Sequence, residues 1–182
     1  MKLALASDVH LEFGDINLEN TENADILILA GDICVAKDCI DPNYMGERNR
    51  NFFQRVTTQF PKVIYVMGNH EHYDGDFIKS KNILQKMFDD LFLSNVFLLE
   101  KESITIDNFT FIGGTLWTDM NKKDPLTMWN AGKSMNDYKI GDFGEATFIA
   151  KKGWKAETVC YAELAQKITA HCQQKSYQLI EY

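Results

Sequence analysis

Short apolar runs near the start of the chain predict the first elements of its fold. They cover residues 3–6, 24–30 and 63–67. Nearly continuous apolar runs of this length are typical of strands that are buried on both faces of a sheet. We therefore predict three buried strands and an α/β fold in which helices pack on sheets.

Between and after these runs, apolar residues recur at helical spacing. The stripe over residues 48–60 predicts one helix, and the stripe over residues 77–92 predicts a second. A third helix is predicted over residues 155–173. Further short strands are predicted over residues 96–99, 103–106, 109–112 and 177–182. Asp107-Asn108 predicts a tight hairpin turn, and residues 113–153, which are rich in Gly, Asn and Lys, are expected to be mostly loop.

Each of the three buried runs is followed at once by polar side chains that can bind a metal. Asp8 and His10 follow the first run, Asp32 follows the second, and Asn69 and His70 follow the third. Ligands of α/β proteins bind where the carboxyl ends of parallel strands meet, so these side chains are expected to converge on one edge. Asp8 and His10 are two residues apart and would point the same way from an extended backbone.

The candidate ligands form a mixed set of carboxylate, imidazole and amide donors. Such a set suits Mn, Fe, Zn or Co, with Mg less favoured. Asp32 could bridge two metal ions, and two-metal sites clamp the attacking and the leaving oxygen of a phosphoryl transfer. Gly31 and Gly68, which directly precede Asp32 and Asn69, would let the chain turn sharply there. Asp-x-His is common in loops, Gly-Asp ends many strands, and Asn with Gly also makes ordinary turns, so the prediction depends on the three motifs together.

The composition limits the partners that can be expected. With 182 residues and 45% hydrophobic content, residues 1–182 are predicted to form a single domain. A net charge of −7 makes nucleic acid a possible but unfavoured partner, because phosphate contacts need clustered Lys and Arg. Bound cations would still allow an anionic phosphate-ester substrate. The oligomeric state is not indicated.

The sequence carries no run of about 18 consecutive apolar residues, so no membrane-spanning helix is predicted. The start of the chain lacks a secretory cleavage pattern, and we expect a cytoplasmic protein. Four cysteines occur outside any CxxC pair. Free thiols are the favoured interpretation, and a structural zinc site that joins Cys34 and Cys39 to Cys160 and Cys172 is the alternative.

Three motifs together resemble a known family. Asp8-Val9-His10, Gly31-Asp32 and Gly68-Asn69-His70-Glu71 resemble the first three motifs of the calcineurin-like metallophosphoesterases. Residues 113–119 and 135–138 resemble a bacterial and phage-encoded branch of that family, and the resemblance covers about residues 1–140.

This resemblance implies a four-layer α/β/β/α sandwich around a dinuclear metal centre. By analogy, Asp8 and His10 would bind the first metal, Asp32 would bridge, and Asn69 would bind the second. A metal-bound hydroxide would attack the phosphorus of a phosphomonoester or phosphodiester. His70 would lie near the leaving-group oxygen as a general acid or a stabiliser of charge. Glu71 could orient its neighbours from behind the ligands.

The family also carries later histidines, among them a Gly-His-x-His motif, that complete both metal shells. This sequence has four histidines, His10, His70, His72 and His171, and no Gly-His-x-His motif. We therefore expect a C-terminally truncated form of the domain. A catalytically weak or inactive remnant that binds metal or phosphate is the alternative function. His171 lies beside the apolar stripe of a predicted helix, and neither it nor His72 is predicted to replace the missing ligands.

Overall fold

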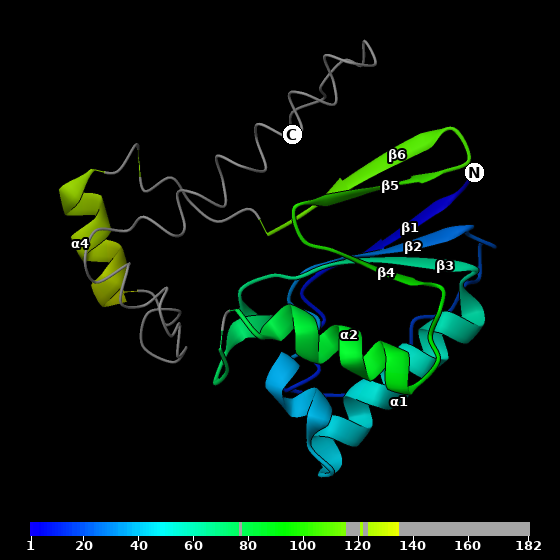
Figure 1. The fold of residues 1–182 in the computed structure, drawn as a ribbon, viewed down its shortest axis with the longest axis horizontal. Helices are drawn as coiled ribbons and strands as arrows, with labels where there is room; N and C mark the ends of the chain where they lie inside the picture. Colours follow the sequence, from blue (N-terminus) through cyan, green and yellow to red (C-terminus); the bar gives the residue numbers. More distant parts are fainter. Residues whose placement is uncertain (77, 116–120, 122–123, 135–182) are drawn as a thin grey trace.

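The structure is a computed structural model in which residues 1–76, 78–115, 121 and 124–134 are described (Figure 1). Several predictions concern residues outside these ranges: the helix over residues 155–173, the strand over residues 177–182, and the positions of Cys160, Cys172 and His171.

A four-stranded parallel sheet forms the centre of the described part. Its strands lie in the order β1-β2-β3-β4, and all three neighbouring pairs are parallel. The bounds are β1 Leu3–Ala6, β2 Ile26–Ala30, β3 Lys62–Val66 and β4 Val96–Leu99. All four predicted strands are present, and the α/β class is confirmed. The prediction that the first strand is buried on both faces is wrong, because the β1 side chains of Leu3 and Leu5 are exposed.

Two helices cover one face of the sheet (Figure 1). α1 spans Tyr44–Gln59 and α2 spans Ser80–Asp90, and each overlaps a predicted helix. α1 begins before its apolar stripe because the side chain of Asn43 accepts a hydrogen bond from the Gly46 amide at 3.0 Å and so caps the first turn. Two short 3₁₀ helices, η1 Ala36–Ile40 and η2 His70–His72, follow the second and third strands.

The main core lies between this helical face and the sheet. Phe53 of α1, Phe88 of α2 and Tyr65 of β3 are almost fully buried there, and the rings of Phe53 and Phe88 meet edge to face with centroids 4.9 Å apart. Aromatic contacts of this kind stabilise beyond the apolar area they bury. The packing fixes the ends of β2 and β3, from which the polar loops emerge.

An antiparallel hairpin covers part of the other face of the sheet. β5 Glu102–Ile106 pairs with β6 Phe109–Gly113, as the predicted turn required. A second, smaller core of Ile26, Ile64, Leu99 and Ile106 joins the hairpin to the sheet. Helices, sheet and hairpin make three layers, and within the described residues no second helical layer covers the hairpin (Figure 1).

The expectation that residues 113–153 are mostly loop is wrong over α4, which spans Pro125–Ser134. The Asp124 carboxylate accepts hydrogen bonds from the backbone amide and the hydroxyl of Thr127, at 2.7 and 2.8 Å. An acidic cap followed by Pro at the first helical position is a known helix start. Asp124-Pro125 was therefore the available signal.

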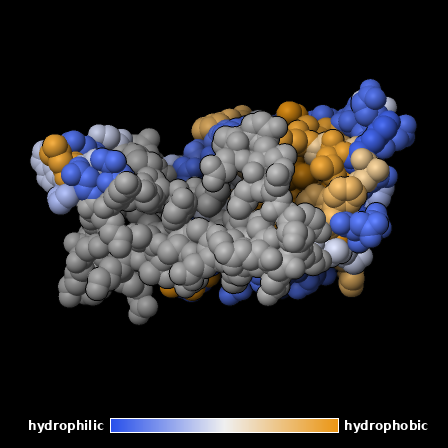
Figure 2. Space-filling model, turned by 90° about the horizontal axis from the view of Figure 1, so that it is seen from above, coloured by the Kyte–Doolittle hydropathy of each residue, from blue (hydrophilic) through white to orange (hydrophobic). Residues whose placement is uncertain are grey.

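Some apolar side chains on the hairpin side of the sheet stay exposed. Leu3 and Leu5 of β1 are 50% and 71% exposed, and they pair with Ile26 and Ile28, whose side chains belong to the hairpin core. Figure 2, a view from the hairpin side, shows hydrophobic residues gathered in the right-hand part of the surface. No helix of the described part is long and apolar enough to cross a membrane.

Candidate metal centre

Backbone hydrogen bonds hold the loops after β1 and β2 together beyond the ends of the strands. The amides of Asp8, His10 and Leu11 donate to the carbonyls of Gly31, Asp32 and Ile33, at 3.1, 2.9 and 2.9 Å. The two loops therefore continue side by side at the carboxyl edge of the sheet. This brings the first two polar motifs together, as predicted.

Three of the candidate residues have a left-handed backbone. The φ angles are 54° at Asp8, 50° at His10 and 54° at Asp32. This region costs a non-glycine residue on the order of 1–3 kcal/mol and is concentrated at functional sites. The prediction that Asp8 and His10 project from an extended backbone is wrong, because β1 ends at Ala6 and the chain turns at both residues.

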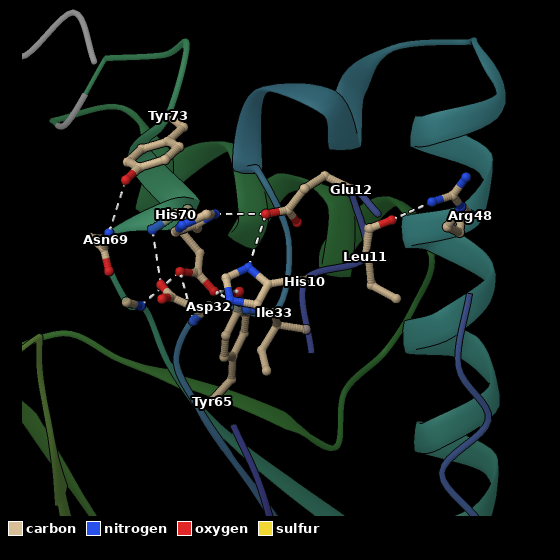
Figure 3. A network of polar contacts seen from close by, with 12 residues as sticks. His10, Leu11, Glu12, Asp32, Ile33, Arg48, Tyr65, Asn69, His70 and Tyr73 are labelled. Atoms are coloured by element: carbon tan, nitrogen blue, oxygen red, sulfur yellow. Dashed lines mark hydrogen bonds and ion pairs between the residues drawn. The ribbon is translucent and has the colours of Figure 1, made fainter. Parts of the chain in front are cut away.

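The structure brings His10, Asp32 and His70 together. One ligand atom of each lies within 4.8 Å of the others, and all three side chains are partly buried. The rings of His10 and His70 meet edge to face with centroids 4.3 Å apart (Figure 3). Among the described residues, this is the cluster of His, Cys, Asp and Glu side chains that could hold a metal ion.

The other two predicted ligands flank this cluster. Asp8 is exposed, is not part of the cluster, and its carboxylate accepts a hydrogen bond from the hydroxyl of Ser7. Asn69 directly precedes His70, and its side-chain amide donates to the Tyr73 hydroxyl at 3.2 Å (Figure 3). The Tyr73 ring stacks on His70, with centroids 4.2 Å apart.

The loops after β2 and β3 meet at Asp32. One oxygen of its carboxylate accepts a hydrogen bond from the backbone amide of His70 at 2.9 Å. A Cβ at Gly68 would overlap that same oxygen and would lie 2.7 Å from the Asp32 amide nitrogen. Gly31 has a φ of 91°, which only glycine adopts without strain. Gly31 is thus needed for its backbone angle, whereas Gly68 is needed for the space it leaves.

Glu71 joins the same two loops from below. It is fully buried, and its carboxylate accepts from the backbone amides of Asp32, Ile33 and Gly68 and from the Tyr65 hydroxyl, at 2.7–3.1 Å. Burial raises the pKa of Glu71, and these hydrogen bonds oppose the rise only in part. Glu71 thus has the orienting contacts that the family resemblance suggested.

Glu12 lies beside the cluster and was not predicted from the sequence. One oxygen of its carboxylate lies 3.0 Å from Nδ1 of His10 and 2.7 Å from Nδ1 of His70 (Figure 3). Burial acts to raise the pKa of Glu12, but hydrogen bonds with its own amide and with both imidazoles outweigh burial and hold the pKa below its usual value. The sequence offered little signal, because His70 is 58 residues away along the chain.

Three further residues considered from the sequence are buried. His72 is 2% exposed and is not part of the cluster, and burial lowers its pKa to about 4. Cys34 and Cys39 are free and buried, and their sulfur atoms lie 3.7 Å apart. Cys160 and Cys172, the other two residues of the zinc alternative, lie outside the described residues.

The donors present fit a divalent metal. Two imidazoles and a carboxylate lie within reach of a common ion, an amide side chain is adjacent, and such a set suits borderline ions such as Mn, Fe, Zn or Co. The carboxylates of Glu12 and Glu71 near the cluster would also favour a cation. Fold and donor set together define an α/β protein with a candidate metal centre at the carboxyl edge of a parallel sheet.

Comparison with known proteins supplies the family. The model of the calcineurin-like phosphoesterases matches residues 1–166, and the chain belongs to this family. The resemblance read from the three motifs is thereby confirmed, together with the metallophosphoesterase fold.

Two relatives show how the chain compares in length. Uncharacterized protein L509 of Acanthamoeba polyphaga mimivirus is 28% identical over an alignment of 186 positions, which takes in 87% of this chain and 60% of that protein. The crystal structure of a phosphopantetheinyl hydrolase (PptH) from Mycobacterium tuberculosis superposes with a TM-score of 0.63 at 17% identity, over 95% of this chain and 63% of that one. The second likeness shows the fold alone. The chain spans less than two thirds of either protein.

Proposed function

We propose that this chain is a metal-dependent phosphoesterase that hydrolyses phosphomonoesters or phosphodiesters at a dinuclear site. The observation that carries the proposal is the cluster of His10, Asp32 and His70, delivered by three different loops to one edge of the sheet. Membership of a phosphoesterase family supports the reaction class. The acidic net charge of −7 also supports a cation-dependent reaction, because an anionic substrate would otherwise be repelled.

In this proposal each residue has a distinct task. Asp8 and His10 would hold one metal ion, Asn69 would help to hold the second, and Asp32 would be shared between the two. When bound, the ions supply a water-derived nucleophile at neutral pH and neutralise charge on the phosphoryl group. The backbone amide of His70 holds the Asp32 carboxylate in place. His70, in its imidazolium form, protonates the leaving oxygen or stabilises its charge.

The test uses the whole chain loaded with Mn²⁺ and an aryl phosphate monoester or diester. We expect Mn²⁺-stimulated release of the aryl alcohol, and its loss in Asp32→Ala. Asp90→Ala is the matched control, because that carboxylate is exposed and pairs with Lys86 along α2. A folded, Mn²⁺-bound chain that cleaves neither ester would refute the proposed activity.

A second candidate function is metal or phosphate binding without turnover. It is favoured by one observation: within the described residues the structure forms a single three-residue cluster, and Asp8 lies outside it. Isothermal titration calorimetry separates the candidates. One Mn²⁺ per chain without hydrolysis supports the binding protein, whereas two ions per chain with hydrolysis support the enzyme.

A further inference from the structure

Glu12 forms contacts that packing alone does not explain. Its side chain is only 14% exposed, and one of its carboxylate oxygens faces two imidazole nitrogens at hydrogen-bonding distance. The second oxygen, Oε2, is buried and has no hydrogen-bond partner among the described residues. The ion pairs found in the described part join Glu12 only to the two histidines and to no Lys or Arg. The two imidazoles are therefore the partners that hold this partly buried carboxylate in its charged form.

The geometry determines which nitrogen of each ring carries a proton. An ionised carboxylate oxygen only accepts hydrogen bonds, so Nδ1 of His10 and Nδ1 of His70 must both be donors to Glu12. A neutral imidazole has one donor and one acceptor nitrogen. The lone pair of each neutral ring is therefore on Nε2, the nitrogen that Glu12 does not engage.

We propose that Glu12 is a positioning residue that orients His10 and His70 together and holds both rings in the Nδ1–H tautomer. This role of Glu12 rests on the proposed function, because the orientation of the two rings matters only if Nε2 of His10 binds a metal and Nε2 of His70 faces the substrate. A single oxygen shared between the two rings couples their orientations, so one residue sets the ligand and the catalytic group at once. Residues that orient a metal-binding histidine through its other nitrogen are a general feature of metal sites.

The left-handed backbone at His10 supports this assignment. With φ at 50°, His10 begins a turn in which the Phe13 amide donates to the His10 carbonyl at 2.9 Å. That turn brings the Glu12 side chain back to the ring of His10. Arg48 fixes the same turn from α1 by donating to the carbonyl of Leu11 at 2.5 Å (Figure 3). The carboxylate is thus built into the loop and is not a flexible surface group.

The experiment compares wild-type chain with Glu12→Ala, Glu12→Gln and a control, Glu19→Ala, which removes an exposed carboxylate from the same loop. Nitrogen NMR of the metal-free protein at alkaline pH reports the tautomer of each neutral ring. We expect Nδ1–H at His10 and His70 in the wild type and in Glu19→Ala, and a fall in the Nδ1–H share in Glu12→Ala. Glu12→Gln, which keeps an oxygen acceptor, should fall between them.

Calorimetry with Mn²⁺ measures the metal affinity of the same variants. Loss of an outer hydrogen-bond partner costs about 10–100-fold in metal affinity, and we expect a loss of that size in Glu12→Ala and a smaller one in Glu12→Gln. An Nε2–H tautomer of His10 and His70 in the wild type would overturn the proposal. So would a folded Glu12→Ala variant whose tautomers and Mn²⁺ affinity are the same as in the wild type. If the wild type binds no Mn²⁺ while the NMR result holds, the proposed function fails and the tautomer assignment stands.

Discussion

The backbone amide of His70 donates a hydrogen bond to the carboxylate of Asp32 at 2.9 Å. This bond joins the loop after β3 to the loop after β2 through the side chain proposed to bridge two metals. A shift of either loop would therefore move both the carboxylate and the imidazole of the centre. The same dependence explains why Gly68, which leaves room for Asp32, directly precedes the Asn69-His70 pair.

The first prediction separates a metal ligand from a catalytic group. In His10→Ala, Mn²⁺ affinity should fall by more than the roughly 10–100-fold that an outer partner costs, because a direct ligand is removed. In His70→Ala, Mn²⁺ affinity should change little, while kcat on an aryl phosphate ester falls about 100- to 10,000-fold. Calorimetry and steady-state kinetics measure the two effects. If His70→Ala weakens Mn²⁺ binding as much as His10→Ala, then His70 is a ligand, which the cluster of donor atoms also allows.

The second prediction concerns space beside Asp32. Gly68→Ala introduces a methyl group that overlaps the Asp32 carboxylate, and we expect a loss of about 1–3 kcal/mol in the free energy of unfolding, together with weaker Mn²⁺ binding. Gly14→Ala is the control, because a Cβ there meets no atom within 4 Å. The control should lie within about 1 kcal/mol of the wild type. Urea denaturation and calorimetry provide the measurements, and equal behaviour of the two variants would contradict the overlap.

The layered fold could be predicted from the sequence because its strands carry a local signal. The run at residues 3–6 has the bounds of β1, and the run at residues 63–67 differs from β3 by one residue at each end. Helix starts were less well predicted, because capping governs them more than periodicity does. Asn43 and Asp124 begin α1 and α4 ahead of any apolar stripe.

The site was predictable only as far as strand order determines it. Parallel strands placed Asp32 beside His10, and the motifs identified both. The left-handed turn at His10 could not be read from the sequence, because such a backbone in a non-glycine residue depends on contacts made elsewhere. The same turn brings Glu12 to His70, and no periodic pattern encodes that contact.

The third prediction tests the buried carboxylate that joins the two loops. In Glu71→Gln, an amide NH₂ must face hydrogen-bond donors, whichever way the side chain is turned. Tyr65 can rotate its hydroxyl to accept, but a backbone amide cannot, so at least one buried donor loses its partner. We expect a loss of about 1–3 kcal/mol in the free energy of unfolding, more than is regained by removing a buried charge.

Glu102→Gln is the control for this change. Its carboxylate is half exposed and pairs with Lys81 at the surface, so its effect should stay within about 0.5 kcal/mol. Urea denaturation at one pH measures both variants. A Glu71→Gln variant as stable as the control would show that its four hydrogen bonds contribute little to the junction.

The fourth prediction concerns the thiols beneath the centre. The hydrogen-bonding contact with Cys39, together with full burial, raises the pKa of Cys34 well above its usual value. Cys34 should therefore stay protonated at pH 8 and at pH 9. The thiolate is the reactive form, so this protonated thiol should react slowly. Alkylation by iodoacetamide in the native protein should therefore be slower than in urea, by on the order of 100-fold or more, since the side chain must first be exposed.

Mass spectrometry of peptides locates the label on Cys34 and Cys39 separately from Cys160 and Cys172. The same chain in urea is the control, in which all four cysteines should react at similar rates because no residue is buried. Native labelling of Cys34 at the urea rate would mean that the loop between β2 and η1 opens freely. In that case the same opening would also displace Asp32, two residues earlier, and Mn²⁺ should then slow the labelling by holding the loop closed.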